Sequence, residues 1–204
     1  MPNISVNTSR GLTLIELMIA LSIGMIILGA LTTTFILQRK AYNIQEQVIE
    51  MTQIARAAMD MIGREVRMAG YFNSAKPMQC DSSADPDFVG IPATASCLEI
   101  LADLTGDGDT GDANEHIIYT FDSDERMIRR NTGGGAQPFA ENIQNFSFTY
   151  LDSDGNPATT DAAIRNIRIT ITARTVQSDS HDPDVGAGTL TLVQDVYPRN
   201  LGLR

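Results

Sequence analysis

The first seventy residues form a pattern typical of one long helix with two kinds of surface. Residues 17–38 carry no charged side chain, and Arg39 and Lys40 follow at once. As a helix, this uncharged run is about 33 Å long at about 1.5 Å per residue, which is enough to cross a bilayer core of about 30 Å. The run is therefore expected to be a membrane-spanning or assembly helix.

Beyond Lys40 apolar residues recur every three or four positions, which predicts an amphipathic continuation of the helix. This apolar stripe comprises Ile44, Val48, Met51, Ala55, Ala58, Ile62 and Val66. Two roles are open for it: covering a globular core, which is favoured for its C-terminal half, or contacting neighbouring subunits. Gly70 is a helix stop, so the pattern predicts one helix from Leu12 to about Ala69.

After Gly70 the pattern changes to short alternating segments separated by Asp, Ser, Gly and Asn, which predicts strands and turns. Strands are expected at 116–121, 127–130, 146–151, 167–174 and 190–197. The clearest is 167–174, where Ile167, Ile169, Ile171 and Ala173 share one face. An antiparallel sheet with its apolar face packed on the long helix is expected, which makes the fold class α+β.

The N-terminal and C-terminal parts of the chain differ in net charge. The 204 residues carry a formal charge of −10; residues 12–70 hold five acidic and five basic side chains, whereas 71–204 hold 20 acidic and 9 basic ones. This balance argues against nucleic acid as a partner, since phosphate binding needs a basic surface. With only two Cys and two His, neither a Cys-rich secreted scaffold nor a multi-histidine metal enzyme is expected. No nucleophile or metalloprotease motif is present either, so we expect no enzymatic activity.

Glu16 interrupts the apolar start of the helix. A secretory signal peptide is one alternative, but the apolar stretch is too long and no Ala-x-Ala cleavage site follows it. A carboxylate in hydrocarbon needs a partner. If the chain is cut between Gly11 and Leu12, the new ammonium on Leu12 stands one helical turn from Glu16. That ammonium could pair with Glu16 in the same chain or in another subunit.

The string Arg-Gly-Leu-Thr-Leu-Ile-Glu at residues 10–16 resembles the class III signal of type IV prepilins and type II secretion pseudopilins. The resemblance implies that a prepilin peptidase cuts after Gly11, that Leu12 is N-methylated, and that Glu16 serves assembly. REVRMAGYF at 64–72 and VYPRNL at 196–201 are similar to PilW-type minor pilins and their GspJ-type pseudopilin relatives.

This resemblance implies a layout of four parts. They are a leader at 1–11, a transmembrane and assembly helix at 12–38, an amphipathic helix at 39–70 and a β-rich acidic head at 71–204. The expected location is the inner membrane with a periplasmic head, and afterwards a pilus filament or its tip.

The implied function is that of a minor pilin that takes part in initiating type IV pilus assembly. The implied partners are other major and minor pilins, the prepilin peptidase, the inner-membrane assembly machinery and membrane lipid. Two alternatives are a type II secretion pseudopilin and a membrane-anchored binding protein that never polymerises.

Cys80 and Cys97 are the only cysteines. A translocated head would be exposed to an oxidising compartment, where such a pair usually closes. We therefore expect a Cys80–Cys97 disulfide, the alternative being two free thiols.

The acidic segment 103–112 resembles part of a calcium loop, with oxygen-bearing side chains at loop positions 1, 3 and 5 and glycine at position 6. The acidic residue usual at position 12 is replaced by Asn114, and Glu115 follows one place late. Calcium is the candidate cofactor and a solvated acidic loop is the alternative. The candidate ligands are Asp103, Thr105, Asp107, Asp109 and Asp112.

Overall fold

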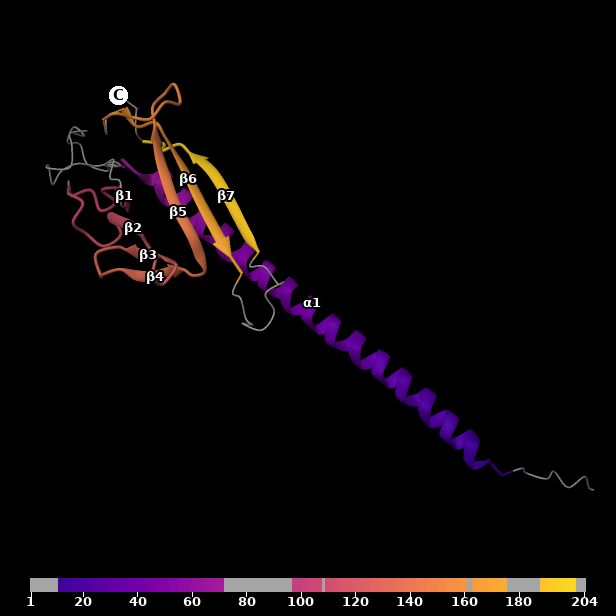
Figure 1. Cartoon of the computed structure of the whole chain (residues 1–204). Coiled ribbons are helices and arrows are strands. Elements are labelled where there is room, and N and C mark those ends of the chain that lie inside the picture. Colours follow the sequence, from indigo (N-terminus) through magenta and orange to yellow (C-terminus); the bar gives the residue numbers. More distant parts are fainter. Residues whose placement is uncertain (1–10, 72–96, 108, 161–162, 176–187, 201–204) are drawn as a thin grey trace, which may run out of the picture. The chain divides into compact units, whose positions relative to one another are not determined.

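The structure, a computed structural model, describes residues 11–71, 97–107, 109–160, 163–175 and 188–200. The chain divides into two compact units, residues 1–46 and residues 47–204. Within the residues just given, one long helix is followed by seven strands in two antiparallel sheets (Figure 1). The expected α+β pilin-like class is therefore confirmed.

Helix α1 spans Leu14–Met68, 55 residues, within two residues of the predicted bounds at its start and one at its end. No proline interrupts it. Its end is set by Gly70, whose φ of 74° lies in the left-handed region that glycine adopts without strain. The Gly70 amide then donates to the carbonyl of Leu101, which ties the helix end to the first strand.

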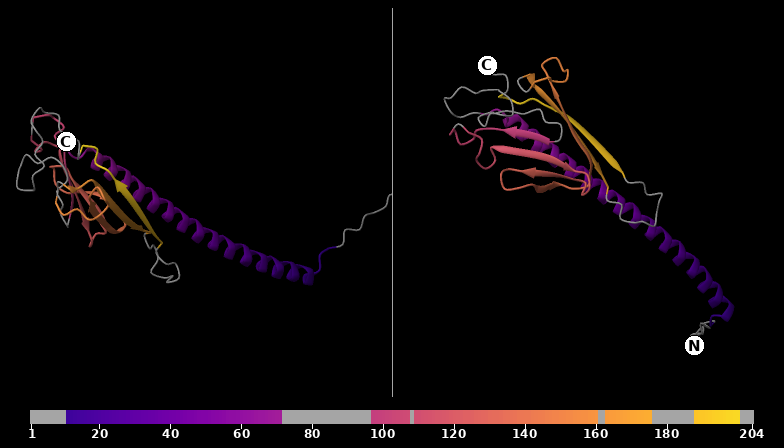
Figure 2. Two further views of the ribbon diagram at one scale, coloured as in Figure 1. Left: turned by 90° about the horizontal axis from the view of Figure 1, so that it is seen from above. Right: turned by 60° about the vertical axis from the view of Figure 1, so that its left-hand side comes forward.

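The strands form one four-stranded and one three-stranded sheet. The first sheet, in the order β1-β2-β3-β4, comprises Cys97–Leu101, His116–Asp122, Met127–Asn131 and Gln137–Ala140. The second, in the order β5-β6-β7, comprises Ile143–Leu151, Asn166–Arg174 and Thr189–Val196. The three-stranded sheet runs beside the C-terminal part of α1 in two views (Figures 1 and 2).

All five predicted strands are present, although β5 begins three residues earlier than expected. Strands β1 and β4 were not predicted, and they are the two edges of the four-stranded sheet. Both are short, and β4 contains Pro138, which an edge strand tolerates because it leaves one row of amides without ladder partners.

One hydrophobic cluster joins α1 to both sheets. Ile62 and Val66 of the helix are fully buried, as are Ile167, Ile169 and Ile171 of β6, so the predicted apolar face of this strand is confirmed. The predicted helix stripe is buried from Met51 onward, whereas Ile44 and Val48 are exposed. The core role is thus confirmed for the C-terminal part of the stripe.

A buried polar group lies within this apolar contact. The Glu65 carboxylate on α1 accepts a 2.5 Å hydrogen bond from the Tyr119 hydroxyl on β2 and a 2.7 Å bond from Arg130 Nη2 on β3. Burial, and then the hydrogen bond to Glu65, hold the pKa of Tyr119 well above its usual range, so this hydroxyl remains a donor. The three side chains lock the helix against two strands.

The C-terminal segment closes the end of α1. The side-chain amide of Asn200 donates to the carbonyls of Met68 and Ala69 at 3.2 and 3.4 Å, and the Arg199 amide donates to the carbonyl of Arg67. Carbonyls at a helix end have no partner inside the helix, so these bonds satisfy groups that would otherwise need water. The two segments similar to PilW-type proteins thus lie together in the fold.

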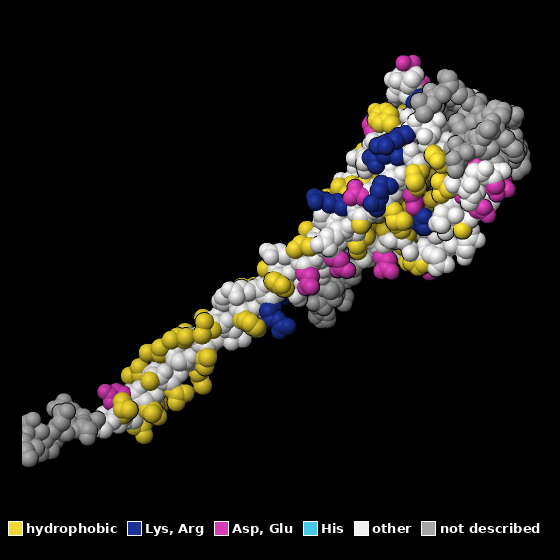
Figure 3. Space-filling model, turned by 180° about the vertical axis from the view of Figure 1, so that it is seen from behind, with side chains coloured by type: hydrophobic (Ala, Val, Ile, Leu, Met, Phe, Trp, Pro, Cys, Tyr) yellow, Lys and Arg dark blue, Asp and Glu magenta, His cyan; other side chains and the backbone are white. Residues whose placement is uncertain are grey.

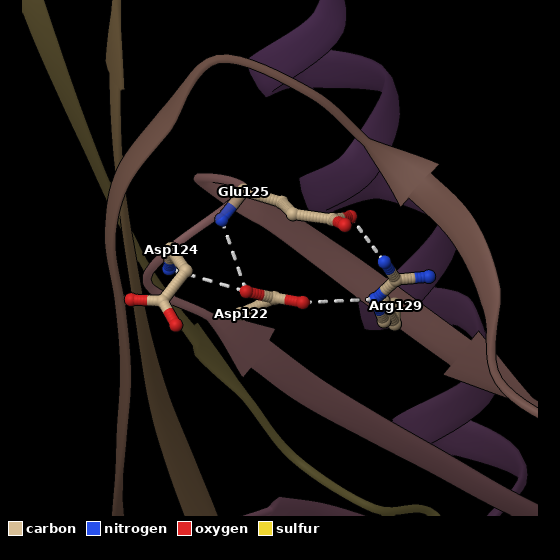
Figure 4. Close-up of polar contacts among 4 residues, drawn as sticks. All are labelled: Asp122, Asp124, Glu125 and Arg129. Atoms are coloured by element: carbon tan, nitrogen blue, oxygen red, sulfur yellow. Dashed lines mark hydrogen bonds and ion pairs between the residues drawn. The ribbon is translucent and has the colours of Figure 1, made fainter.

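A carboxylate also organises the turn between β2 and β3 (Figure 4). Asp122 Oδ1 accepts from the backbone amides of Glu125 and Asp124 at 3.0 and 3.1 Å, and its Oδ2 accepts from Arg129 Nε at 3.2 Å. Arg129 also pairs with the Glu125 carboxylate. The amide of Glu125, followed by the Arg129 guanidinium, lowers the pKa of Asp122.

This lowered pKa predicts a loss of stability in acid. A carboxyl whose pKa is lower in the folded chain stabilises it above the unfolded pKa of about 3.9, and this contribution disappears as the pH falls through the folded pKa. In thermal melts of the detergent-solubilised chain, the difference between wild type and Asp122→Asn should be constant from pH 7 to pH 5 and shrink below about pH 4. A difference that stays constant down to pH 2 would contradict this prediction.

Candidate functional site

The start of α1 is held by a reciprocal pair of hydrogen bonds between Thr13 and Glu16. The Thr13 backbone amide and hydroxyl both donate to Glu16 Oε2 at 2.8 Å, and the Glu16 amide donates back to Thr13 Oγ1 at 3.3 Å. This is a capping box, in which a Thr side chain and a Glu three residues later satisfy amides that the first turn leaves without partners. Glu16 thus stabilises the helix start in the uncut chain.

This capping role of Glu16 is not among the predictions from the sequence, which pair its carboxylate with the Leu12 amine. The signal was present, since Thr-x-x-Glu ahead of an apolar run is the usual pattern of a capping box. Both bonds from Thr13 go to Oε2, and no described residue donates to Oε1. The second carboxylate oxygen therefore remains available to a donor from outside the chain.

Gly11 and Leu12 lie immediately before the helix and are exposed, Leu12 at 83%. No atom of the described residues lies within 4 Å of the place that a Cβ would occupy at Gly11. Among the described residues, nothing blocks the access of another protein to the predicted cleavage junction between Gly11 and Leu12.

The segment that follows exposes its apolar side chains, and Figure 3 shows them along the visible side of the N-terminal part of α1. The helix is long and apolar enough to cross a membrane, with a mean hydropathy of 2.4 in its most apolar window, none of which is buried in the chain itself. Exposed apolar area of this extent marks a surface that lipid or another protein covers.

The uncharged polar side chains of this apolar segment are compatible with its burial in lipid or against another protein. The hydroxyls of Ser22, Thr32, Thr33 and Thr34 each donate to the carbonyl four residues earlier, at 2.8 to 3.0 Å. A hydroxyl that is satisfied inside its own helix needs no water. The described residues before Arg39 contain one charged side chain, that of Glu16. Glu16 is thus the one group in this segment whose burial in lipid or protein would require a partner of opposite charge.

The acidic segment after β1 brings together only some of the predicted calcium ligands. Asp103 and Asp107 meet Glu115, and one ligand oxygen from each lies within 4.8 Å of those from the other two. Asp109 and Asp112 are not part of this group, and Asp109 Oδ1 accepts from the Gly111 amide instead.

Thr105 enters this loop through its backbone. Its amide donates to Glu115 Oε1 at 2.7 Å, next to a second 2.7 Å bond from the Leu104 amide. Glu115 is brought to Asp103 by the antiparallel pairing of β1 with β2, since both residues lie at the same end of this strand pair. Sequence spacing within a single loop does not reveal this meeting.

Cys97 begins β1 and is half-buried. Cys80 lies outside the described residues, so the disulfide between Cys80 and Cys97 stays a prediction.

Three features together define a type IV prepilin-like protein. They are an accessible Gly-Leu junction, a glutamate at the start of an exposed apolar helix, and an antiparallel β head. The prokaryotic N-terminal methylation motif matches residues 6–32, which include Gly11, Leu12 and Glu16. Prepilin peptidase-dependent protein B matches residues 44–193, and the chain belongs to this family. No curated protein matches the chain significantly.

Membership in this family has consequences for partners and location. Dependence on prepilin peptidase implies an interaction with that enzyme and with the pilin assembly system. The apolar helix, together with the methylation motif, indicates anchoring in a membrane.

Proposed function

We propose that this protein is a PilW-type minor pilin that takes part in initiating type IV pilus assembly. It is inserted in the inner membrane with its head in the periplasm and is cut after Gly11. It then enters a filament through α1 and is found in the pilus filament or its tip at the cell surface. Its role is structural rather than catalytic, and its partners are major and minor pilins and the inner-membrane assembly machinery.

The observation that carries this proposal is the carboxylate of Glu16 at the start of an exposed apolar helix. A lone charge at the edge of hydrocarbon is costly, and an ammonium from another subunit offsets that cost. Thr13 occupies Glu16 Oε2, which leaves Oε1 for such an ammonium. After cleavage, the new amine of Leu12 on a neighbouring subunit would carry the positive charge that binds Oε1, and this pairing would set the stagger between helices.

A type II secretion pseudopilin is the second candidate within the same family group, because prepilin peptidase also processes pseudopilins. Neighbouring genes separate these two systems. Detection of the chain in sheared filaments separates both from a membrane-anchored binding protein that does not polymerise.

Glu16→Ala should leave membrane insertion intact and lower incorporation into filaments about tenfold or more. Hydrogen bonds to charged groups are among the stronger polar interactions, so the loss of one at a subunit contact should change the assembly equilibrium about tenfold or more. The measurement is the amount of chain in sheared filaments divided by the amount in the membrane. Glu16→Gln separates charge from shape and should also be impaired.

Thr13→Val is the matched control, because it removes the hydroxyl from the capping box and keeps the charge of Glu16. If the charge serves assembly, Thr13→Val incorporates close to the wild-type level. Equal incorporation of Glu16→Ala and wild type would overturn the proposal. Equal losses in Thr13→Val and Glu16→Ala would assign Glu16 to helix capping alone.

A further inference from the structure

Three carboxylates meet where the loop after β1 returns to β2. Asp103 is fully buried, Glu115 is 1% exposed, and Asp107 is exposed. Their ligand oxygens all lie within 4.8 Å of one another. Carboxylates this close repel one another when they are removed from water, and a cation bound among them would relieve this repulsion.

Glu115 supplies a second and independent observation. Its Oε1 accepts from two backbone amides, whereas its Oε2 is buried and has no hydrogen-bond partner among the described residues. No described Lys or Arg forms an ion pair with it. A buried carboxylate oxygen without a donor costs free energy unless something binds it. This oxygen belongs to the carboxylate that faces Asp103 and Asp107.

We propose that Asp103, Asp107 and Glu115 bind one calcium ion. Calcium prefers carboxylate and carbonyl oxygens at about 2.3–2.6 Å, so two ligands on opposite sides of one ion lie about 4.8 Å apart. The observed spacing therefore lets all three side chains reach a single ion. The ion supplies the missing partner of Glu115 Oε2 and neutralises most of the charge of the cluster.

This site differs from the one that the loop pattern suggests. A linear calcium loop would use Asp109 and Asp112, whereas the site proposed here takes Glu115 from the start of the next strand. Bound calcium would clamp the exit of β1 to the entry of β2, and it would stabilise this end of the sheet. The proposal does not depend on the assembly role of the N-terminal helix.

The test uses the full chain, purified in detergent and freed of metal with a chelator. Calcium alone, at about 100 times its Kd, should raise the melting temperature of wild type by about 5 °C or more. Equilibrium dialysis with radioactive calcium should give one ion per chain. Glu115→Gln keeps the size of the side chain, removes its charge, and should abolish both effects.

Asp109→Asn and Asp112→Asn are matched controls, because they remove acidic residues of the same loop that lie outside the cluster. Both should keep the calcium response. Asp107→Asn, at an exposed ligand, provides a second test if Glu115→Gln does not fold, and it should weaken calcium binding at least tenfold. Magnesium at the same concentration should give a smaller shift.

Three results would overturn the proposal. The first is a wild-type melting temperature that calcium up to 10 mM leaves unchanged (about ten times the weakest Kd typical of extracellular calcium modules). The second is a calcium response in Glu115→Gln equal to that of wild type. The third is a melting temperature of Glu115→Gln above that of wild type without calcium, together with no calcium binding by wild type, which would show that the cluster is destabilised by repulsion and holds no ion.

Discussion

Arg130→Met is expected to lower the free energy of unfolding by about 3 kcal/mol or more, because it leaves a buried carboxylate without its cation. Glu65 is 6% exposed, and Arg130 is the only cation paired with it among the described residues. Methionine keeps much of the length and apolar surface of arginine, so the change removes mainly the charge. Thermal or denaturant unfolding of the full chain in detergent measures the loss.

Arg168→Met is the matched control for this prediction. Arg168 on β6 forms two hydrogen bonds with Asp195 on β7, at 2.7 and 2.9 Å, but its side chain is 52% exposed. Ion pairs at such exposure contribute little to stability, because solvent and salt screen them. If Arg130→Met costs no more than Arg168→Met, the buried pair does not hold the helix to the sheet.

A double variant distinguishes the contribution of the Glu65–Arg130 ion pair to stability from that of apolar packing at the same place. The double variant Glu65→Leu with Arg130→Met should recover much of the stability that Arg130→Met loses, since well-packed apolar residues often replace a buried ion pair without loss. Tyr119 would then lose its acceptor, so recovery is expected to be incomplete.

Gly11→Val should block processing, so that the chain keeps residues 1–11 and never starts at N-methyl-Leu12. The described surroundings of Gly11 leave room for a side chain, and its φ is not in the left-handed region. A block would therefore arise in the peptidase, where a branched side chain shifts the bond to be cut. A misplacement of about 1 Å lowers the rate by about 100-fold. Mass spectrometry of the intact membrane-bound chain measures the ratio of long to short forms.

Leu12→Phe is the control for processing, because it keeps an apolar residue after the junction and leaves Gly11 unchanged. This variant should be cut as wild type is. Intact residues 1–11 on the wild-type chain in assembled material would contradict the cleavage prediction, as would normal processing of Gly11→Val.

Features that depend on neighbours in the sequence were predictable. The apolar run, the helix stop at Gly70 and the alternation along β6 all follow from the periods of the two backbone conformations. The capping box of Thr13 and Glu16 was equally local and was missed only because its pattern was not considered. The edge strands β1 and β4, of five and four residues, were missed, and Pro138 within β4 argues against a strand in the sequence.

Features that join distant parts of the chain were not predictable in the same way. Glu65 and Arg130 stand 65 positions apart, and Asn200 lies 132 positions after the helix carbonyl that it caps. In the sequence, Glu65 is one more charged residue on an amphipathic helix. Its burial follows only from the position of β2 and β3 over that face of α1.

The acidic loop shows the same division. The sequence alone determined that the loop carries many carboxylates. It also determined that the preceding helix is long, is apolar at its start and follows a Gly-Leu junction. These properties are set by local composition and by the spacing of apolar residues. Tertiary structure alone decided which carboxylates meet. The pairing of β1 with β2 places Glu115 against Asp103, while Asp109 and Asp112 stay outside the cluster. Strand pairing sets such meetings through hydrogen bonds between separate segments, which no spacing within one segment encodes.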